Sequence, residues 1–234
     1  MSFDISYALE LFGKSFLAAR ITFLITFVSM LFGIVIALAV AMVNYKHMRL
    51  LSAISKVYIS FIRGTPMMIQ IYLIYYLIPR LVNHFVEAWQ LDFDIYAVNT
   101  MVYAYIVFSL HAGATLGEVF RGALSTVEVG QVEAAYAIGM TGWQTFLRVI
   151  FPQSVVVAIP NICTNFINIL KATSLVFSMA ILDITGVAKV AANESYKFLE
   201  AYLAILLVYV IICYIAERIF KRVEKAIGKY RLAA

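Results

Sequence analysis

Three stretches of the chain are long and free of charge, and they limit the fold more than any other feature of the sequence. They cover residues 21–45, 95–117 and 149–170 and contain no Asp, Glu, Lys or Arg. At a rise of about 1.5 Å per residue, each is long enough to cross a hydrocarbon core of about 30 Å as a helix. Charged residues make up 13% of the 234 residues, whereas a soluble domain carries about 25%. An all-α polytopic membrane protein is therefore predicted.

Two shorter apolar runs complete the set of predicted spans. Extension past Arg63 and past Glu200 makes both long enough, because charged side chains at a span end can snorkel. Apolar residues at helical spacing before the first span predict a short N-terminal amphipathic helix on the membrane surface. We expect one transmembrane domain over residues 1–234, with five helices at residues 17–44, 57–80, 95–117, 149–172 and 199–218.

The basic residues lie at the ends of the predicted spans. Although the net charge is +5, they form no stripe interleaved with aromatic residues, so nucleic acid is not an expected partner. Lys and Arg are concentrated in residues 44–57, 118–148 and 217–234, which share one side of a five-span protein. The positive-inside rule then places the C-terminus in the cytoplasm and the N-terminus outside. The basic tail is expected to be amphipathic and to lie on anionic lipid headgroups, with a solvated end as the alternative.

The cytoplasmic segment between the third and fourth spans has mixed polarity. Good helix formers in "QVEAAYAIG" are followed by Gly139 and Gly142, and a second helical segment, "WQTFLRVIFP", follows. Four apolar side chains would be exposed here unless something covered them: Val132, Tyr136, Ile138 and Met140. They favour a docking surface for another protein, and a loop folded over its own span ends is the alternative that the residues leave open.

This segment resembles the signature loop of the membrane permeases of ATP-binding-cassette (ABC) importers. Glu-Ala-Ala, three residues, Gly, about ten residues, an apolar residue and then Pro are matched by Glu133, Ala134, Ala135, Gly139, Ile150 and Pro152. Residues 63–79, 117–153 and 159–175 are similar to the branch that imports polar amino acids. The resemblance implies a type I importer permease fold with a cytoplasmic coupling loop at 119–151, in the bacterial cytoplasmic membrane.

The same resemblance implies partners and roles. The coupling helix, carrying Glu133, Ala134, Ala135 and Gly139, is expected to sit in a cleft of a separate ATPase, which binds ATP and Mg²⁺. The other expected partners are a second permease subunit, identical or related, an extracytoplasmic substrate-binding protein, membrane lipid and a polar amino acid. No cofactor and no metal are expected in this chain.

The fourth span carries a stripe of carboxamides. Asn161, Asn165 and Asn168 lie at i, i+4 and i+7 and therefore share one helical face. Such a stripe is costly against lipid, so it faces either protein or a water-filled path. Carboxamides suit a zwitterion because they offer donors and acceptors without charge. Interhelical hydrogen bonding is an equally weighted alternative. Thr173 and Ser174, beyond the stripe, are assigned to the same substrate pathway.

Ala172 stands where the resembling branch often has Asp, so a fixed counter-charge for a cationic side chain is missing. Neutral polar amino acids, including cystine, are therefore favoured over arginine, lysine and histidine. The sequence also departs from the branch at residues 113–118, where Gly-Ala-Thr-Leu-Gly-Glu replaces the usual Ala-Tyr-x-Ala-Glu pattern. Both departures bear on the substrate.

The second predicted span starts irregularly, because Pro66 follows Arg63, Gly64 and Thr65. Broken backbone at membrane depth is tolerated only against protein or a cavity, and Gln70 is assigned to the substrate pathway. Elsewhere, three further interpretations concern single features: an aromatic belt for Tyr72, Tyr75 and Tyr76, a structural role for His111, and an ion pair between Glu118 and Arg121 that braces the loop.

Enzymatic activity is not expected. "GKS" at residues 13–15 has Ala8 where a phosphate-binding loop needs its first Gly, and no catalytic constellation stands out. Cys163 and Cys213 fall in apolar runs and are expected to be packing thiols. The main alternative function is a secondary transporter driven by an ion gradient without an ATPase, but an acidic site at mid-membrane and an inverted repeat are not apparent.

Overall fold

The computed structural model describes residues 3–46 and 48–231, which are almost entirely helical. Within these ranges no strand is formed. The elements in chain order are α1 (Ile5–Tyr45), α2 (Arg49–Gly64), α3 (Met67–Tyr72), η1 (Leu73–Leu77), α4 (Ile78–Ala88), η2 (Ile95–Ala97), α5 (Thr100–Leu124), α6 (Val129–Ala137), α7 (Gly142–Thr145), η3 (Phe146–Ile150), α8 (Phe151–Ala172), η4 (Thr173–Met179), α9 (Ile184–Ser195) and α10 (Phe198–Arg231).

Four helical stretches are long and apolar enough to cross a membrane: α1, α5, the run Gly142–Met179 and the part Phe198–Ile227 of α10. A fifth crossing depends on a broken pair, because the helices of Arg49–Gly64 and Met67–Ala88 meet at an angle of 113°. The expected second span at 57–80 is therefore not straight. The break falls at Thr65 and Pro66, as the irregular start predicted, since Pro66 removes a backbone donor.

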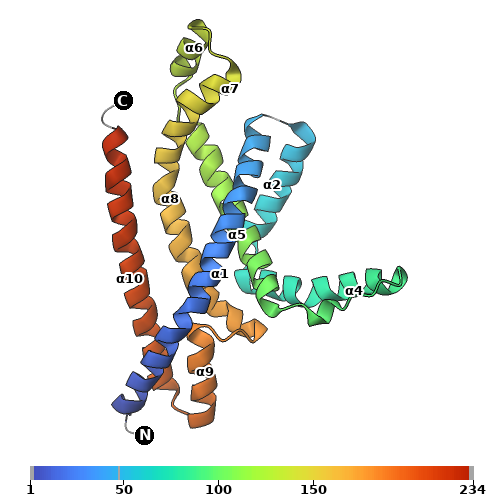
Figure 1. Cartoon of the computed structure of the whole chain (residues 1–234), viewed down its shortest axis with the longest axis vertical. Coiled ribbons are helices and arrows are strands. Elements are labelled where there is room, and N and C mark those ends of the chain that lie inside the picture. The colour runs from blue at the N-terminus through green and yellow to red at the C-terminus, as the bar shows by residue number, and fades with distance from the viewer. Residues whose placement is uncertain (1–2, 47, 232–234) are drawn as a thin grey trace.

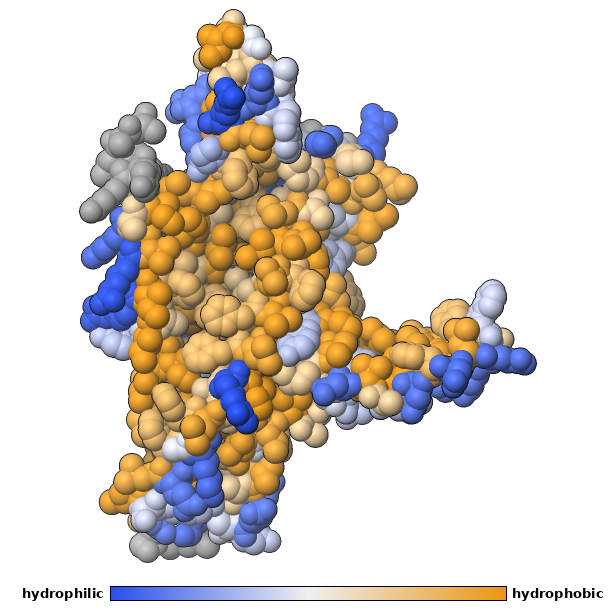
Figure 2. Space-filling view, in the orientation of Figure 1, coloured by the Kyte–Doolittle hydropathy of each residue, from blue (hydrophilic) through white to orange (hydrophobic). Residues whose placement is uncertain are grey.

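The long helices pack side by side in a bundle (Figure 1). α1 and α5 cross near its centre, and α6 and α7 form a protrusion at one end, which we call the loop end. The C-terminus lies toward the loop end, whereas the N-terminus and α9 lie at the opposite end. Figure 2 shows a broad apolar surface between two more polar ends. The arm formed by α3, η1 and α4 projects sideways from the bundle.

We expected the N-terminal stretch to form a separate amphipathic helix, but it is the first part of α1. No proline interrupts it, and Asp4 caps its start by accepting a hydrogen bond from the Tyr7 backbone N–H at 3.0 Å. Lys197 Nζ donates to the Asp4 carboxylate at 2.6 Å. Leu11 is buried in a small cluster with alanines of α9 and α10. This packing holds the stretch against the bundle.

Glycines allow α1 and α5 to approach closely. A Cβ added to Gly113 would lie 2.6 Å from Cγ2 of Ile36, and one added to Gly117 would lie 2.9 Å from Cγ1 of Val40. A Cβ on Gly33 would overlap the Cβ of Ala112. Small residues favour such contacts in membranes, because helix association there depends on van der Waals packing. The departure from the branch pattern at residues 113–118 thus includes two packing glycines.

Two widened helical turns precede prolines. The π-helical turn η1 ends two residues before Pro79, and η3 ends two residues before Pro152. A proline within a helix removes a hydrogen bond to the carbonyl four residues earlier, and its ring crowds that carbonyl. In both cases that carbonyl belongs to the π-helical turn, so the helix continues by widening rather than by breaking.

Asp183 is a buried carboxylate between the predicted spans, at the end opposite the loop end. It caps α9 by accepting from the Gly186 backbone N–H at 2.9 Å, and the Tyr209 hydroxyl donates to it at 3.2 Å. Burial raises the pKa of Asp183 to about 6, above its ordinary value of 3.8. A raised pKa means that the folded state binds a proton more tightly than the unfolded state does.

We therefore expect Asp183→Asn to change the pH dependence of stability. Asn keeps an acceptor for Gly186 and carries no charge to desolvate, so the variant gains most relative to the wild type at pH 7.5. That gain should shrink by about 2 kcal/mol at pH 4.5, because the wild-type carboxyl is then protonated when folded. Thermal unfolding of both proteins at the two pH values measures this difference, and a difference that does not depend on pH would contradict the assignment.

Candidate functional site

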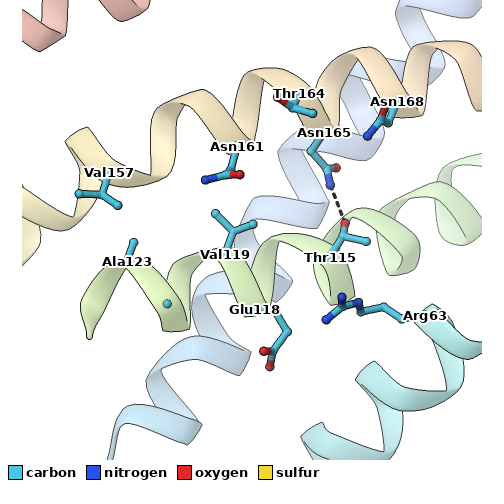
Figure 3. Close-up of a pocket in the computed structure, with 11 residues that line it drawn as sticks. Arg63, Thr115, Glu118, Val119, Ala123, Val157, Asn161, Thr164, Asn165 and Asn168 are labelled. Carbon is cyan, nitrogen blue, oxygen red and sulfur yellow. Dashed lines mark hydrogen bonds between the residues drawn. The ribbon is translucent and has the colours of Figure 1, made fainter. Parts of the chain in front are cut away.

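A polar cavity of about 460 Å³ opens between α2, α5 and α8. Figure 3 shows its lining side chains, which come from three helices. The lining is formed by Arg63, Thr115, Glu118, Val119, Gly122, Ala123, Val157, Asn161, Thr164, Asn165 and Asn168. Its volume lies within the range of about 300–1,000 Å³ that is typical of ligand pockets.

The three carboxamides predicted to share a face all line this cavity. Asn165 Nδ2 donates to the Thr115 hydroxyl of α5 at 2.8 Å, which is an interhelical hydrogen bond. The Asn165 Oδ1 atom is buried and has no hydrogen-bond partner among the described residues. Asn161 and Asn168 are exposed at the cavity and make no side-chain hydrogen bond within the described part of the chain. One carboxamide thus bonds between helices, and two are open to a ligand.

Charged groups gather at the same cavity. Glu118 and Arg121 form the ion pair that their spacing predicted, with Arg121 Nη2 at 2.8 Å from Glu118 Oε2 and Arg121 Nε at 3.2 Å from the same oxygen. Arg63, at the C-terminal end of α2, also lines the cavity. Figure 3 shows the side chains of Arg63 and Glu118 on the side of α5 that faces away from α8.

Gln70 lies at the break between α2 and α3 and does not line this cavity. Its side chain is 3% exposed. Gln70 Nε2 donates to the backbone carbonyls of Ile62 at 2.7 Å and Thr65 at 3.0 Å, where the helix ends without regular partners. Its Oε1 lies 3.2 Å from His111 Nδ1. This carboxamide therefore satisfies the broken backbone, and His111 joins the same network.

Thr173 and Ser174 also lie outside the cavity lining. Thr173 is fully buried, and its hydroxyl donates to the Leu170 carbonyl at 2.8 Å. Ser174 is half-buried in the short helix η4. Both belong to the turn in which α8 ends.

The loop end carries the helix–turn–helix that the sequence predicted. α6 contains Glu133, Ala134 and Ala135, and of these only Ala135 is buried. Gly139 ends the helix with a φ of +84°. The backbone N–H of Met140 bonds to the Ala135 carbonyl, as in a Schellman motif. Gly142 does not stop a helix but begins α7.

Several large apolar side chains are exposed at the loop end. Ile138 is 75% exposed and Tyr136 is 52% exposed, in agreement with the sequence analysis, whereas Val132 and Met140 are half-buried. Two further side chains, Val129 and Trp143, are 70% and 63% exposed. Sequence analysis did not single them out, because Val129 precedes the first helical segment and Trp143 was counted only as the start of the second.

α6 is joined to the start of α8 by side chains. Gln153 Nε2 donates to Gln131 Oε1 at 2.7 Å and to the Val149 carbonyl at 3.0 Å. Thr141 and Gln144 form a reciprocal capping box at the start of α7. The run from Gly142 to Met179 continues as one long helical stretch into the cavity. The loop end and the cavity are therefore connected through α8.

A polar cavity among membrane-crossing helices, connected to an exposed helical loop at one end, is an arrangement typical of membrane transport proteins. A family model described as "Binding-protein-dependent transport system inner membrane component" matches residues 29–229. The chain belongs to this family. It is the multi-pass permease component of an ABC importer in the bacterial inner membrane, and a separate ATPase subunit hydrolyses ATP.

Characterised relatives are similar over most of their length. The L-cystine transport system permease protein TcyL of Bacillus subtilis (strain 168) is 35% identical over 209 residues, covering 89% of this chain and 85% of the relative. The nopaline transport system permease protein NocM of Agrobacterium fabrum (strain C58 / ATCC 33970) is 30% identical over 230 residues, covering 94% and 90%. Membership of this family does not support the alternative function of a secondary transporter without an ATPase.

The fold is that of solved ABC importers. A crystal structure of an amino acid ABC transporter with histidines has a TM-score of 0.80 at 23% identity, covering 97% of this chain and 100% of that chain. An inward-facing structure of the MetNI methionine ABC transporter has a TM-score of 0.70 at 19% identity. Among the described residues, no group of three or more His, Cys, Asp or Glu side chains could hold a metal ion.

Proposed function

We propose that this permease carries a polar L-amino acid into the cell and that neutral zwitterions such as cystine are preferred over cationic amino acids. The match to amino-acid permeases over most of the chain carries this proposal, because the relatives include the L-cystine permease TcyL. The chemistry of the cavity supports it. Among the described residues that line the cavity, the one carboxylate, Glu118, is already paired with Arg121, so these residues offer no unpaired acid to a cationic side chain.

The loop end is the surface that contacts the ATPase. Glu133, Ala134 and Gly139 are exposed there, and Ala135 packs inward. Large exposed apolar side chains beside them favour a protein partner, because a monomer rarely leaves such a group uncovered. The Gln131–Gln153 hydrogen bond links this surface to α8. Closure of ATPase subunits, which bind ATP and Mg²⁺, would in this way move the helix that lines the cavity.

The cavity is one half of the substrate pathway, and a second permease subunit completes it. Asn161, Asn165 and Asn168 line a cavity that is open on one side in the single chain. The substrate enters from a binding protein at the end opposite the loop end. With the loop end in the cytoplasm, the N-terminus lies outside, in agreement with the excess of Lys and Arg near the loop end.

Uptake competition tests the substrate class. The permease is assembled in proteoliposomes with its ATPase and binding protein, and import of radiolabelled L-cystine is measured against an excess of single amino acids. We expect strong competition by neutral polar amino acids and weak competition by arginine, lysine and histidine. Preferred uptake of arginine would overturn the assigned class, and uptake that persists without the ATPase would overturn the proposed mechanism.

A further inference from the structure

Arg63 lies at the cavity without an assigned partner. It occupies the last turn of α2, immediately before the break at Thr65 and Pro66. Its guanidinium makes no hydrogen bond or ion pair with any residue that the structure describes. Figure 3 shows it directed toward the part of the cavity that Thr115 and Glu118 border. Arg63 is thus a cation between helices that are otherwise mainly apolar.

Glu118, the one acid among the described residues that line the cavity, does not balance this charge. Glu118 is bound by Arg121 through three contacts of 2.8 to 3.3 Å. The three charged groups together leave one positive charge in excess. Arg63 is exposed at the cavity, so its guanidinium can be reached by a ligand, and an anionic group is the ligand chemistry that this excess positive charge favours.

The opposite wall supplies neutral acceptors. The carboxamides of Asn161 and Asn168 are exposed at the cavity, and the Asn165 carbonyl oxygen lacks a partner among the described residues. Carboxamide oxygens accept hydrogen bonds from an ammonium group without requiring a fixed negative charge. Arg63 and these acceptors line the same cavity, and their chemistry complements the carboxylate and the ammonium group that an amino acid carries on one carbon atom.

We propose that Arg63 binds the α-carboxylate of the transported amino acid and that the carboxamides of α8 receive its α-ammonium group. The inference rests on the proposed function and assigns an orientation to the substrate in the cavity. A guanidinium suits this role because its planar fork binds both oxygens of a carboxylate. The α-carboxylate and α-ammonium groups that all amino acids share would then be bound between Arg63 and α8. The side chain of the substrate would extend along the rest of the cavity.

Equilibrium binding to the purified permease–ATPase complex, without the binding protein, tests this assignment. The probes are radiolabelled L-cystine and its dimethyl ester, which lacks both carboxylates. We expect the wild-type complex to bind L-cystine at least tenfold more tightly than the ester, since a hydrogen bond between charged groups contributes about 1.5–3 kcal/mol. In Arg63→Gln the ratio of the affinities for L-cystine and for the ester should fall to about one. Arg63→Lys should retain part of the preference for L-cystine.

The ratio of the two affinities separates ligand binding from a purely structural role. If Arg63 had only a structural role, its replacement would weaken the binding of both probes equally and leave the ratio of the two affinities unchanged. That result would overturn the inference. Arg80→Gln is the matched control, because Arg80 is exposed on α4 and lies outside the cavity. If the wild type binds neither L-cystine nor any other amino acid, the proposed function fails and the assignment of Arg63 fails with it. If an amino acid binds and Arg63→Gln keeps the preference for its carboxylate, only the assignment fails.

Discussion

Charge reversal at Glu133 is expected to reduce import at least tenfold without unfolding the permease. Glu133 is exposed on α6 and makes no hydrogen bond or ion pair within the described part of the chain, so its replacement by lysine should disturb little inside this subunit. At the proposed contact with the ATPase, a lysine would meet a surface that is complementary to a carboxylate. Juxtaposition of like charges in an interface costs several kcal/mol, and 1.4 kcal/mol corresponds to about tenfold.

The measurement is uptake of radiolabelled L-cystine, together with the amount of ATPase that co-purifies with the permease. Glu87→Lys provides the control, since Glu87 is an exposed helical carboxylate on the projecting arm, away from the loop end. Its variant should import at the wild-type rate. Normal import by the Glu133 variant would show that α6 does not transmit the action of the ATPase.

Gly33→Ala is expected to produce the largest loss of stability for a single added methyl group. The new Cβ would overlap the Cβ of Ala112, which is attached to the backbone of α5 and cannot rotate away. α1 and α5 would have to separate along the centre of the bundle. Overpacking of this kind costs about 1–3 kcal/mol, so the purified variant should unfold at a lower temperature and be cut faster by protease.

Gly13→Ala tests whether this loss comes from packing or from the helix itself. Gly13 belongs to the same helix, but an added Cβ would meet no atom within 4 Å. Alanine there should be neutral or should stabilise the protein by about 0.5–1 kcal/mol, because glycine is costly within a helix. Equal losses in both variants would argue against the close crossing of α1 and α5.

Hydropathy alone was sufficient to locate the four long apolar helical stretches, because a span requires about 20 apolar residues in one run. The same criterion does not report direction changes between helices. The angle of 113° at Thr65 and Pro66 depends on how Gln70 satisfies the freed carbonyls of Ile62 and Thr65, which are eight and five residues away. No pattern in the local sequence predicts hydrogen bonds over these sequence separations. Continuity between the N-terminal stretch and α1 was missed for a related reason, since its burial depends on α9 and α10.

The site was predictable where helical periodicity governs it. Asn161, Asn165 and Asn168 share a face by spacing alone, and the cavity lies along that face. Arg63 lies in the last turn of α2, immediately before the break, but residue spacing could not predict that it lines a cavity with α5 and α8. The packing roles of Gly33 and Gly113 could not be predicted either, because they depend on the neighbouring helix that each glycine faces.

The continuous helical run from α7 through η3 into α8 has a mechanical consequence. From Gly142 to Asn168 there are about 26 residues, which at about 1.5 Å each form a lever roughly 40 Å long. A rotation of about 10° at the loop end would swing the Asn168 carboxamide by about 7 Å, which exceeds the reach of a hydrogen bond. In the proposed mechanism, a small rotation at the loop end would therefore be enough to break the hydrogen bonds between this carboxamide and a bound substrate.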